Sequence, residues 1–336
     1  MRVSLKKYLI GIDVGGTKCA VILGQRMSSR EEEDDFTFLD HKCFATNTCQ
    51  GPEQVIGRLC SMVQEMLDRF EIGTEEVMSI GISCGGPLDH KHGIIKNPPN
   101  LCGWDDVPIV RCFEEHFGIP THLQNDANAC ALAEWKYGAA KGCENVVFLT
   151  FGTGLGAGLI LNGRLYNGAN DMAGEVGHIR LENTGPVGYG KAGSFEGFCS
   201  GGGIAQLAKL KVLEKLQMGI HPNFCPDLQS LDGLTAQSVA CAAKNGDPLA
   251  QEIYADCGRY MGRGLSILID ILNPEMIVIG SIYERSGDLM NEALYAALQE
   301  ESLAISRNVC RIVPAKLGNR IGDYAALSVA LHGGND

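Results

Sequence analysis

The chain has 336 residues, enough for two domains with separate hydrophobic cores, and its charged fraction of 20% excludes wholesale disorder. Its net charge of −12 argues against nucleic acid as the main partner, because phosphate backbones attract basic surfaces. The first residues hold no long apolar segment, so we expect no signal peptide, no membrane partner and a cytoplasmic location. The 14 cysteines include no CxxC pair, and we expect them to be reduced and mostly buried.

The N-terminal third predicts strands and one amphipathic helix. Residues 8–12 and 19–24 are apolar runs on either side of the turn DVGGTK, and they predict two buried strands. The acidic run at 31–35 predicts a solvated hairpin tip, and the apolar spacing of residues 53–70 predicts a helix. Residues 77–83 predict a strand that leads into the turn CGGPLD.

The remainder alternates between strands and helices. Residues 116–126 predict a helix end, a turn and a short strand, and residues 128–140 predict a helix closed by Gly138. A second apolar hairpin covers 146–163, and a glycine-rich, loop-forming stretch follows over 164–203. Helices are predicted over 235–246, 248–273, 286–298 and 323–334, with a strand over 276–281. This alternation indicates α/β layering.

The two hairpins have nearly the same sequence pattern, LIGIDVGGTKCAVILG and VVFLTFGTGLGAGLILNG. Glycines allow positive φ and let a phosphate approach bare N–H groups. A dinucleotide fingerprint is the alternative for GTGLGAG, but that motif opens a helix, whereas LILNG continues as a strand. The pair therefore predicts two similar halves that close on the phosphates of one nucleotide.

Phosphoryl transfer requires residues that hold phosphates, place a metal ion and deprotonate the acceptor hydroxyl. Asp13 ends the first strand, a suitable place to hold Mg²⁺ through water, and Lys18 is either a phosphate partner or a surface lysine. The predicted phosphate-binding residues of the two turns are Gly15, Gly16, Thr17, Gly152, Thr153 and Gly154.

The candidate general base is Asp126 in the segment LQNDANA. It follows a short predicted strand and precedes a predicted helix. The alternative is that Asn125 or Asp126 only caps that helix. Sugar hydroxyls both donate and accept hydrogen bonds, so carboxylates, amides and an imidazole suit them. The further candidates for sugar contacts are Gly86, Asn100, Glu175, His178 and Glu196.

In order and over nearly the whole chain, these motifs resemble the ROK family (repressor, open reading frame, kinase). The resemblance implies a two-domain actin-like or hexokinase-like ATPase fold, built from duplicated ribonuclease H-like domains with an interdomain cleft. We expect a smaller domain of residues 1–122 and 318–336 and a larger domain of residues 123–317. A homodimer is also implied.

The resemblance further implies phosphorylation of a hexose at the 6-hydroxyl, with ATP and Mg²⁺ required and glucose favoured. Asp126 is then the base and Gly280 lies near the adenosine. The implied sugar-binding residues are Asn100, Asn125, Glu175, His178 and Glu196.

The chain departs from the family pattern in three places. Val187, Tyr189 and Ser194 stand where many members have zinc-binding cysteines, so we expect no structural zinc and packing of this loop by Tyr189, Phe195 and Phe198. Ser281 replaces a common glycine, and we expect ATP binding to survive. Only seven residues precede Tyr8, where family regulators carry a DNA-binding domain, so we expect no nucleic-acid partner. The alternatives are a non-catalytic sugar or nucleotide sensor and an actin-like ATPase.

Overall fold

The computed structural model describes residues 7–27, 35–46 and 51–334, and the chain divides into two compact units. The first unit holds Met1–Tyr137, Leu165–Ala173 and Asn319–Asp336, and the second holds Gly138–Arg164 and Gly174–Gly318. Most of the acidic run at 31–35 lies outside the described residues, so its hairpin tip stays a prediction.

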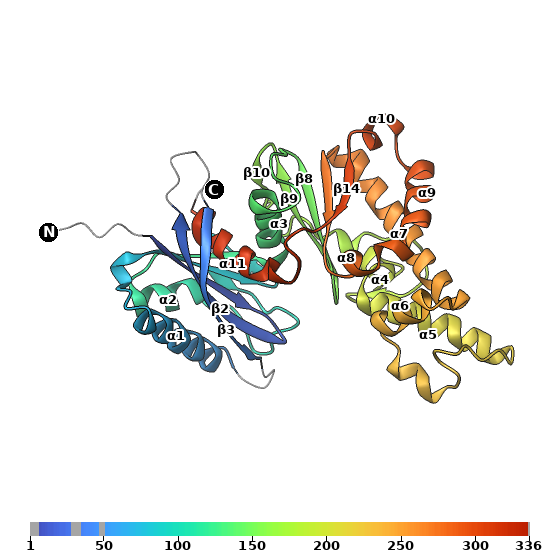
Figure 1. Ribbon diagram of the computed structural model, residues 1–336, viewed down its shortest axis with the longest axis horizontal. Coiled ribbons are helices and arrows are strands. Elements are labelled where there is room, and N and C mark those ends of the chain that lie inside the picture. The colour runs from blue at the N-terminus through green and yellow to red at the C-terminus, as the bar shows by residue number, and fades with distance from the viewer. Residues whose placement is uncertain (1–6, 28–34, 47–50, 335–336) are drawn as a thin grey trace. The chain divides into compact units, whose positions relative to one another are not determined.

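The first unit is built on a five-stranded sheet in the order β3-β2-β1-β4-β7. Strands β2 and β3 are labelled in Figure 1. β1 is antiparallel to β2 and parallel to β4, and β4 is parallel to β7. The carboxyl ends of β1, β4 and β7 therefore meet at one edge of the sheet, where ligands commonly bind in α/β proteins. The strands are β1 (Tyr8–Val14), β2 (Lys18–Met27), β3 (Asp35–Ala45), β4 (Val77–Cys84) and β7 (Thr121–Asn125).

Helices cover both faces of this sheet because successive side chains of a strand point to opposite sides. Ile10 and Ile12 pack in a core with α1 (Pro52–Arg69) and α2 (Ile109–Phe117), whereas Leu9 packs with α11 (Ile321–His332). A Cβ on Gly81 would lie 2.1 Å from Ala330 N, so this glycine is what allows α11 to approach β4. The remaining elements are η1 (Thr74–Glu76), β5 (Leu88–Asp89), β6 (Ile94–Ile95), α3 (Asp126–Tyr137) and η5 (Gly318–Arg320).

The second unit repeats the strand order of the first, as β10-β9-β8-β13-β14. β8 is antiparallel to β9 and parallel to β13, and β13 is parallel to β14. The strands are β8 (Val146–Phe151), β9 (Leu155–Leu161), β10 (Arg164–Leu165), β13 (Met276–Ile279) and β14 (Arg311–Pro314). Each glycine hairpin joins the first two strands of its own sheet, as the sequence predicts.

A long central helix organises the helical part of the second unit (Figure 1). α7 (Pro248–Leu272) begins at the capping residue Asp247 and ends at Asn273, which has a positive φ of 45° and precedes Pro274. It packs against α5, α6 and α9. The remaining elements are η2 (Val176–His178), β11 (Val187–Gly188), β12 (Lys191–Ala192), α4 (Phe195–Phe198), α5 (Gly201–Gln217), η3 (Gln229–Gly233), α6 (Ala236–Lys244), α8 (Ile282–Ser286), η4 (Gly287–Leu289), α9 (Asn291–Glu301) and α10 (Ala304–Arg307).

The division into units differs from the predicted domain boundaries in two respects. The first unit extends to Tyr137, because α3 packs on α11 of that unit. It also includes residues 165–173, which interrupt the second unit. In the described part of the chain, no helix is both long and apolar enough to cross a membrane.

Candidate functional site

In the first unit, the predicted residues gather at the carboxyl ends of β1, β4 and β7. The sheet register pairs Val14 with Cys84 and Cys84 with Asn125. Asp13 near the end of β1, the glycine turn after Cys84 and Asp126 after β7 therefore lie at the ends of neighbouring strands. A Cβ on Gly85 would lie 3.9 Å from Asp126 Oδ2. The parallel strands thus bring the first glycine hairpin and the candidate base to one place.

Two further candidates contact these turns. A Cβ on Gly16 would lie 2.7 Å from Asn100 Cβ, so Asn100 rests against the first glycine turn. A Cβ on Gly86 would lie 3.0 Å from Asn125 Nδ2, so the amide of Asn125 is directed at the turn after β4. The close approach of Asn100 therefore requires glycine at position 16, whereas a side chain at position 86 would only have to displace the amide of Asn125 slightly.

Asn125 supplies most of the cap of α3, one of the two roles that the sequence left open for this dipeptide. α3 begins at Asp126, two residues earlier than predicted, because the Asn125 Oδ1 accepts hydrogen bonds from Ala127 N at 2.9 Å and Asn128 N at 3.4 Å. Asp126 Oδ1 also accepts from Ala127 N, at 2.8 Å. The residue Asp126 nevertheless keeps exposed surface, although neighbouring atoms desolvate its carboxylate.

The two carboxylates of this cluster have raised pKa values. Removal from water raises the pKa of Asp126, although the hydrogen bond from Ala127 opposes that rise. Desolvation, followed by repulsion from Asp126, raises the pKa of Asp13 to about 7. The positive charge of Lys18 partly offsets this rise, because it favours the ionised form of Asp13 and so lowers the pKa.

This charge arrangement fits a divalent cation. Two carboxylates that repel one another are stabilised by a metal ion, and Mg²⁺ usually keeps several waters while bound by one or two carboxylates and substrate phosphates. In the described part of the chain, no group of three or more His, Cys, Asp or Glu side chains could by itself hold a metal ion. Asp13 would therefore hold Mg²⁺ together with water and phosphate.

In the second unit, the turn between β8 and β9 carries the other predicted phosphate ligands. Thr150 Oγ1 accepts a hydrogen bond from Gly156 N at 2.9 Å and so braces the turn. A Cβ on Gly152 would lie 3.7 Å from Ser281 Oγ. The turn at Gly280 and Ser281, which the resemblance assigns to the adenosine, thus lies beside the second glycine turn.

The sequence reasoning missed one feature of this turn, the N-terminus of α5. Gly201 N donates to Gly152 O at 2.8 Å, and Ser200 Oγ caps the helix by accepting from Gly203 N at 2.9 Å. A helix N-terminus favours anions. The signal was present in SGGG ahead of an apolar run, a capping serine followed by residues without side chains.

Glu196 is held directly on the second glycine hairpin. Its Oε2 accepts from Leu155 N at 3.0 Å, and a Cβ on Gly154 would lie 2.7 Å from the same oxygen. A Cβ on Gly177 would lie 3.2 Å from Glu196 Cβ, so η2 packs against this residue. Glu175 and His178 flank that contact and are both exposed.

The loop that lacks zinc ligands is ordered by a small hairpin and an aromatic stack. β11 pairs with β12, Lys191 Nζ donates to His178 O at 2.7 Å, and the buried Phe198 stacks on Tyr260 with ring centroids 3.5 Å apart. Phe195 is fully buried, but Tyr189 is 71% exposed. Tyr189 therefore does not pack the loop as expected, and its ring meets the edge of His178 instead.

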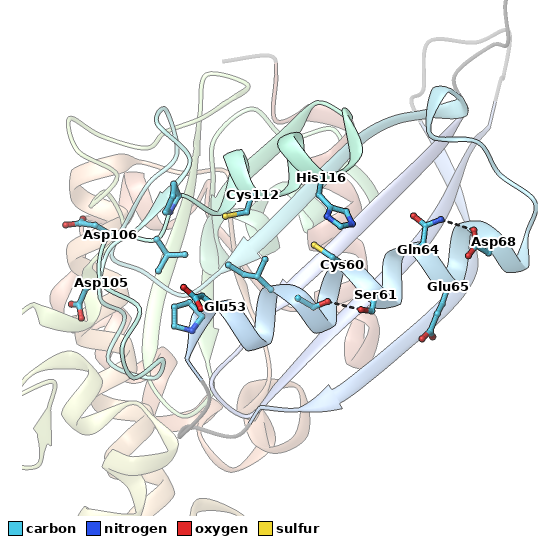
Figure 2. A pocket seen from close by; sticks show the side chains of 15 residues that line it. Glu53, Cys60, Ser61, Gln64, Glu65, Asp68, Asp105, Asp106, Cys112 and His116 are labelled. Carbon is cyan, nitrogen blue, oxygen red and sulfur yellow. Dashed lines mark hydrogen bonds between the residues drawn. The ribbon is translucent and has the colours of Figure 1, made fainter.

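A separate groove of about 850 Å³ lies in the first unit between α1, α2 and residues 105–108 (Figure 2). Its rim is acidic, with Glu53, Asp105 and Asp106 at one end and Asp68 at the other. None of the predicted site residues lines it. The described cysteines, including the two in this groove, are free thiols.

The repeated sheets define the actin-like ATPase fold. One solved structure of this fold is a ROK family glucokinase from Streptomyces griseus in complex with glucose and AMPPNP. It is 27% identical to this chain, with a TM-score of 0.74 over 97% of this chain and 99% of that chain. The chain belongs to the ROK family, whose model matches residues 9–332.

Its relatives include both kinases and regulators. A glucokinase of Streptomyces coelicolor is 29% identical over 328 residues, 96% of each protein. A xylose repressor of Caldicellulosiruptor bescii is also 29% identical, over 270 residues that make up 80% of this chain and 66% of the repressor. Family membership alone does not distinguish the two activities.

Proposed function

We propose that this protein phosphorylates a hexose at the 6-hydroxyl with ATP as donor, and that glucose is the favoured acceptor. The observation that carries the proposal is the clustering of Asp13, Asp126 and a glycine hairpin at the carboxyl ends of three parallel strands. The near full-length similarity to glucokinases supports it. The predicted cytoplasmic location and homodimer stay predictions.

Asp126 is the general base of the proposed reaction. The residue keeps exposed surface, and desolvation of its carboxylate raises the carboxyl pKa toward neutral pH, which favours acceptance of the hydroxyl proton. Asn100 and Asn125 orient the sugar from the same unit, and Glu175, His178 and Glu196 supply the acceptors and donors of the other unit. Their exposure or position on the glycine turns supports these roles.

The glycine turns and Asp13 hold the donor. The N–H groups of Gly16 and Thr17 and those of Thr153 and Gly154 donate to phosphate oxygens, and the α5 N-terminus adds to the positive potential. Gly15 N and Gly152 N instead close their own turns, because they donate to Lys18 O and Gly154 O at 3.1 Å each. Mg²⁺ bound through Asp13 neutralises phosphate charge. The turn at Gly280 contacts the adenosine.

The second candidate is a sugar-responsive protein without catalysis, which the similarity to a repressor favours. The two candidates differ in whether bound sugar is consumed. A panel of glucose, mannose, fructose, allose and N-acetylmannosamine, assayed for ADP release in the presence of ATP and Mg²⁺, tests the proposal. Release of ADP that requires one of these sugars supports a kinase, and sugar binding without release supports the second candidate.

A further inference from the structure

Residues 165–173 form a segment that leaves the second unit and returns to it, which we call the strap. The strap belongs to the first unit, although the chain on both sides belongs to the second. Asn167 O accepts from Ala173 N at 3.2 Å, which closes the strap into a compact loop. The residues that follow it at once are Gly174 and Glu175.

One clasp fixes the strap beside the glycine turn that follows β4. Asp171 Oδ2 accepts from His90 N at 2.8 Å, and Asp171 Oδ1 lies 2.5 Å from His90 Nδ1. The two side chains are only 11% and 8% exposed. Asp171 adopts a positive φ of 63°, which an aspartate tolerates better than most residues, so the backbone is bent to present this carboxylate.

A second clasp fixes the strap to the segment that carries the candidate base. Asn167 Oδ1 accepts from Gln124 Nε2 at 3.1 Å and from Asn128 Nδ2 at 3.0 Å. Gln124 Oε1 accepts in turn from Asn125 N at 2.8 Å. Gln124 and Asn128 are buried, so these bonds are shielded from competing water.

The residue that follows the strap, Gly174, is hydrogen-bonded within the second unit. Gly174 O accepts from Ala157 N at 2.9 Å and from Val176 N at 2.7 Å. Gly174 has a φ of 90°, and a Cβ there would lie 2.0 Å from Ala157 O, so only glycine fits. Glu175 therefore comes directly after two fixed stretches of backbone, the strap and Gly174.

We propose that Asp171 and Asn167 are positioning residues: the two clasps fix the backbone of the strap, which ends two residues before Glu175, and so restrict the conformations of the segment that carries Glu175 and His178. This inference rests on the proposed sugar-binding roles of those two residues. It assigns to the His90–Asp171 and Gln124–Asn167 pairs an effect on sugar affinity, although neither pair belongs to the predicted site.

The test compares Asp171→Gly, which removes the carboxylate but keeps the positive φ available, with Asp171→Asn and Asn170→Ala. Asp171→Gly should raise the KM for sugar about tenfold, because it removes two hydrogen bonds to a buried charged acceptor, and leave kcat and the KM for ATP within about twofold. Asp171→Asn keeps one acceptor oxygen, so its KM for sugar should lie between those of Asp171→Gly and the wild-type protein. Asn170→Ala changes an exposed neighbour and should behave as wild type.

Calorimetric titration of each variant with sugar alone separates the inference from the proposed function. If the wild-type protein phosphorylates a sugar and Asp171→Gly has an unchanged KM for it, the strap has no positioning role. If the wild-type protein binds sugar without phosphorylating it, the proposed function fails, and about tenfold weaker binding to Asp171→Gly still supports the strap. Asn167→Ala is the second variant, with the same expectation, should Asp171→Gly not fold.

Discussion

At the scale of single residues, the dipeptide Asn125–Asp126 joins a helix cap to the proposed general base. The cap of α3 is supplied by the Asn125 side chain, which accepts two hydrogen bonds from the first turn. The Asp126 residue keeps exposed surface, and its carboxylate accepts a hydrogen bond from Ala127 N at 2.8 Å. A raised pKa and an accessible oxygen are what a general base requires.

The role of Asp126 is tested with Asp126→Asn, which keeps the shape of the side chain and removes its basicity. We expect kcat to fall at least about 100-fold while sugar binding, measured by calorimetry, stays nearly intact. Asp105→Asn is the matched control, because Asp105 is an exposed aspartate on the separate groove. Near-normal turnover by Asp126→Asn would exclude Asp126 as the base.

Ionisation of Asp13 suits the proposed binding of Mg²⁺ but lowers the stability of the folded chain. Its pKa rises from 3.8 to about 7 in the folded chain, so the folded state binds the proton more tightly than the unfolded state does. Ionisation of Asp13 therefore lowers the free energy of unfolding as pH increases through this window. The stability that the protonated form contributes is fully present below pH 3.8 and is lost as the pH rises through about 7.

Asp13→Asn removes this titration, so its thermal unfolding midpoint should exceed that of the wild-type protein more at about pH 8 than at about pH 5. Mg²⁺ with nucleotide should raise the midpoint of the wild-type protein but not that of Asp13→Asn. Differential scanning calorimetry measures both effects. An equal difference in midpoint at the two pH values would show that Asp13 is not held in a desolvated, repulsive setting.

At the scale of elements, the second glycine turn packs closely against Glu196 at Gly154. Gly154→Ala places a methyl group 2.7 Å from Glu196 Oε2 and should displace that carboxylate from Leu155 N. We expect the KM for sugar to rise about tenfold, because Glu196 loses its position. Steady-state kinetics at saturating ATP measures this change.

Gly57→Ala is the control for glycine replacement. Gly57 lies within α1 with nothing within 4 Å of an added Cβ, so alanine should stabilise the helix by roughly 0.5–1 kcal/mol without altering kinetics. An unchanged sugar KM in Gly154→Ala would mean that Glu196 does not contact the sugar from this position.

The loop over 185–199 contains the β11–β12 hairpin and α4. In many relatives, zinc is expected to order this loop. Here Phe195, Phe198 and the β11–β12 pairing order it. Treatment with a strong chelator, followed by its removal, should therefore leave the thermal midpoint unchanged. Stoichiometric zinc in the purified protein, found by elemental analysis, would overturn this account.

At the scale of the whole molecule, the duplicated glycine hairpins predicted the duplicated architecture. Both sheets have the same strand order, and each hairpin forms the first two strands of its sheet. Periodicity located α1 and α7 to within a residue or two, because both have a clear apolar face and Pro or Gly at their ends. These signals come from residues close together in the chain, so they can be recognised in the sequence without the structure.

Long-range polar contacts were not predictable in the same way. Nothing in the pattern NGANDMAG indicates that residues 165–173 dock on the first unit, because His90 and Gln124 lie far away in sequence. Likewise, the bond from Leu155 N to Glu196 depends on the path of the intervening loop. The sequence also predicted a packing role for Tyr189, whose positive φ of 43° places it at an exposed hairpin tip instead.

The central claim is that this chain transfers a phosphoryl group from ATP to a hexose. The most direct measurement is phosphorus NMR of a mixture of the protein, ATP, Mg²⁺ and glucose, with ADP quantified in parallel. We predict that sugar 6-phosphate and ADP accumulate in equal amounts and that neither forms with Asp126→Asn at a comparable rate. ADP without sugar phosphate, or glucose binding with neither product, would contradict the claim.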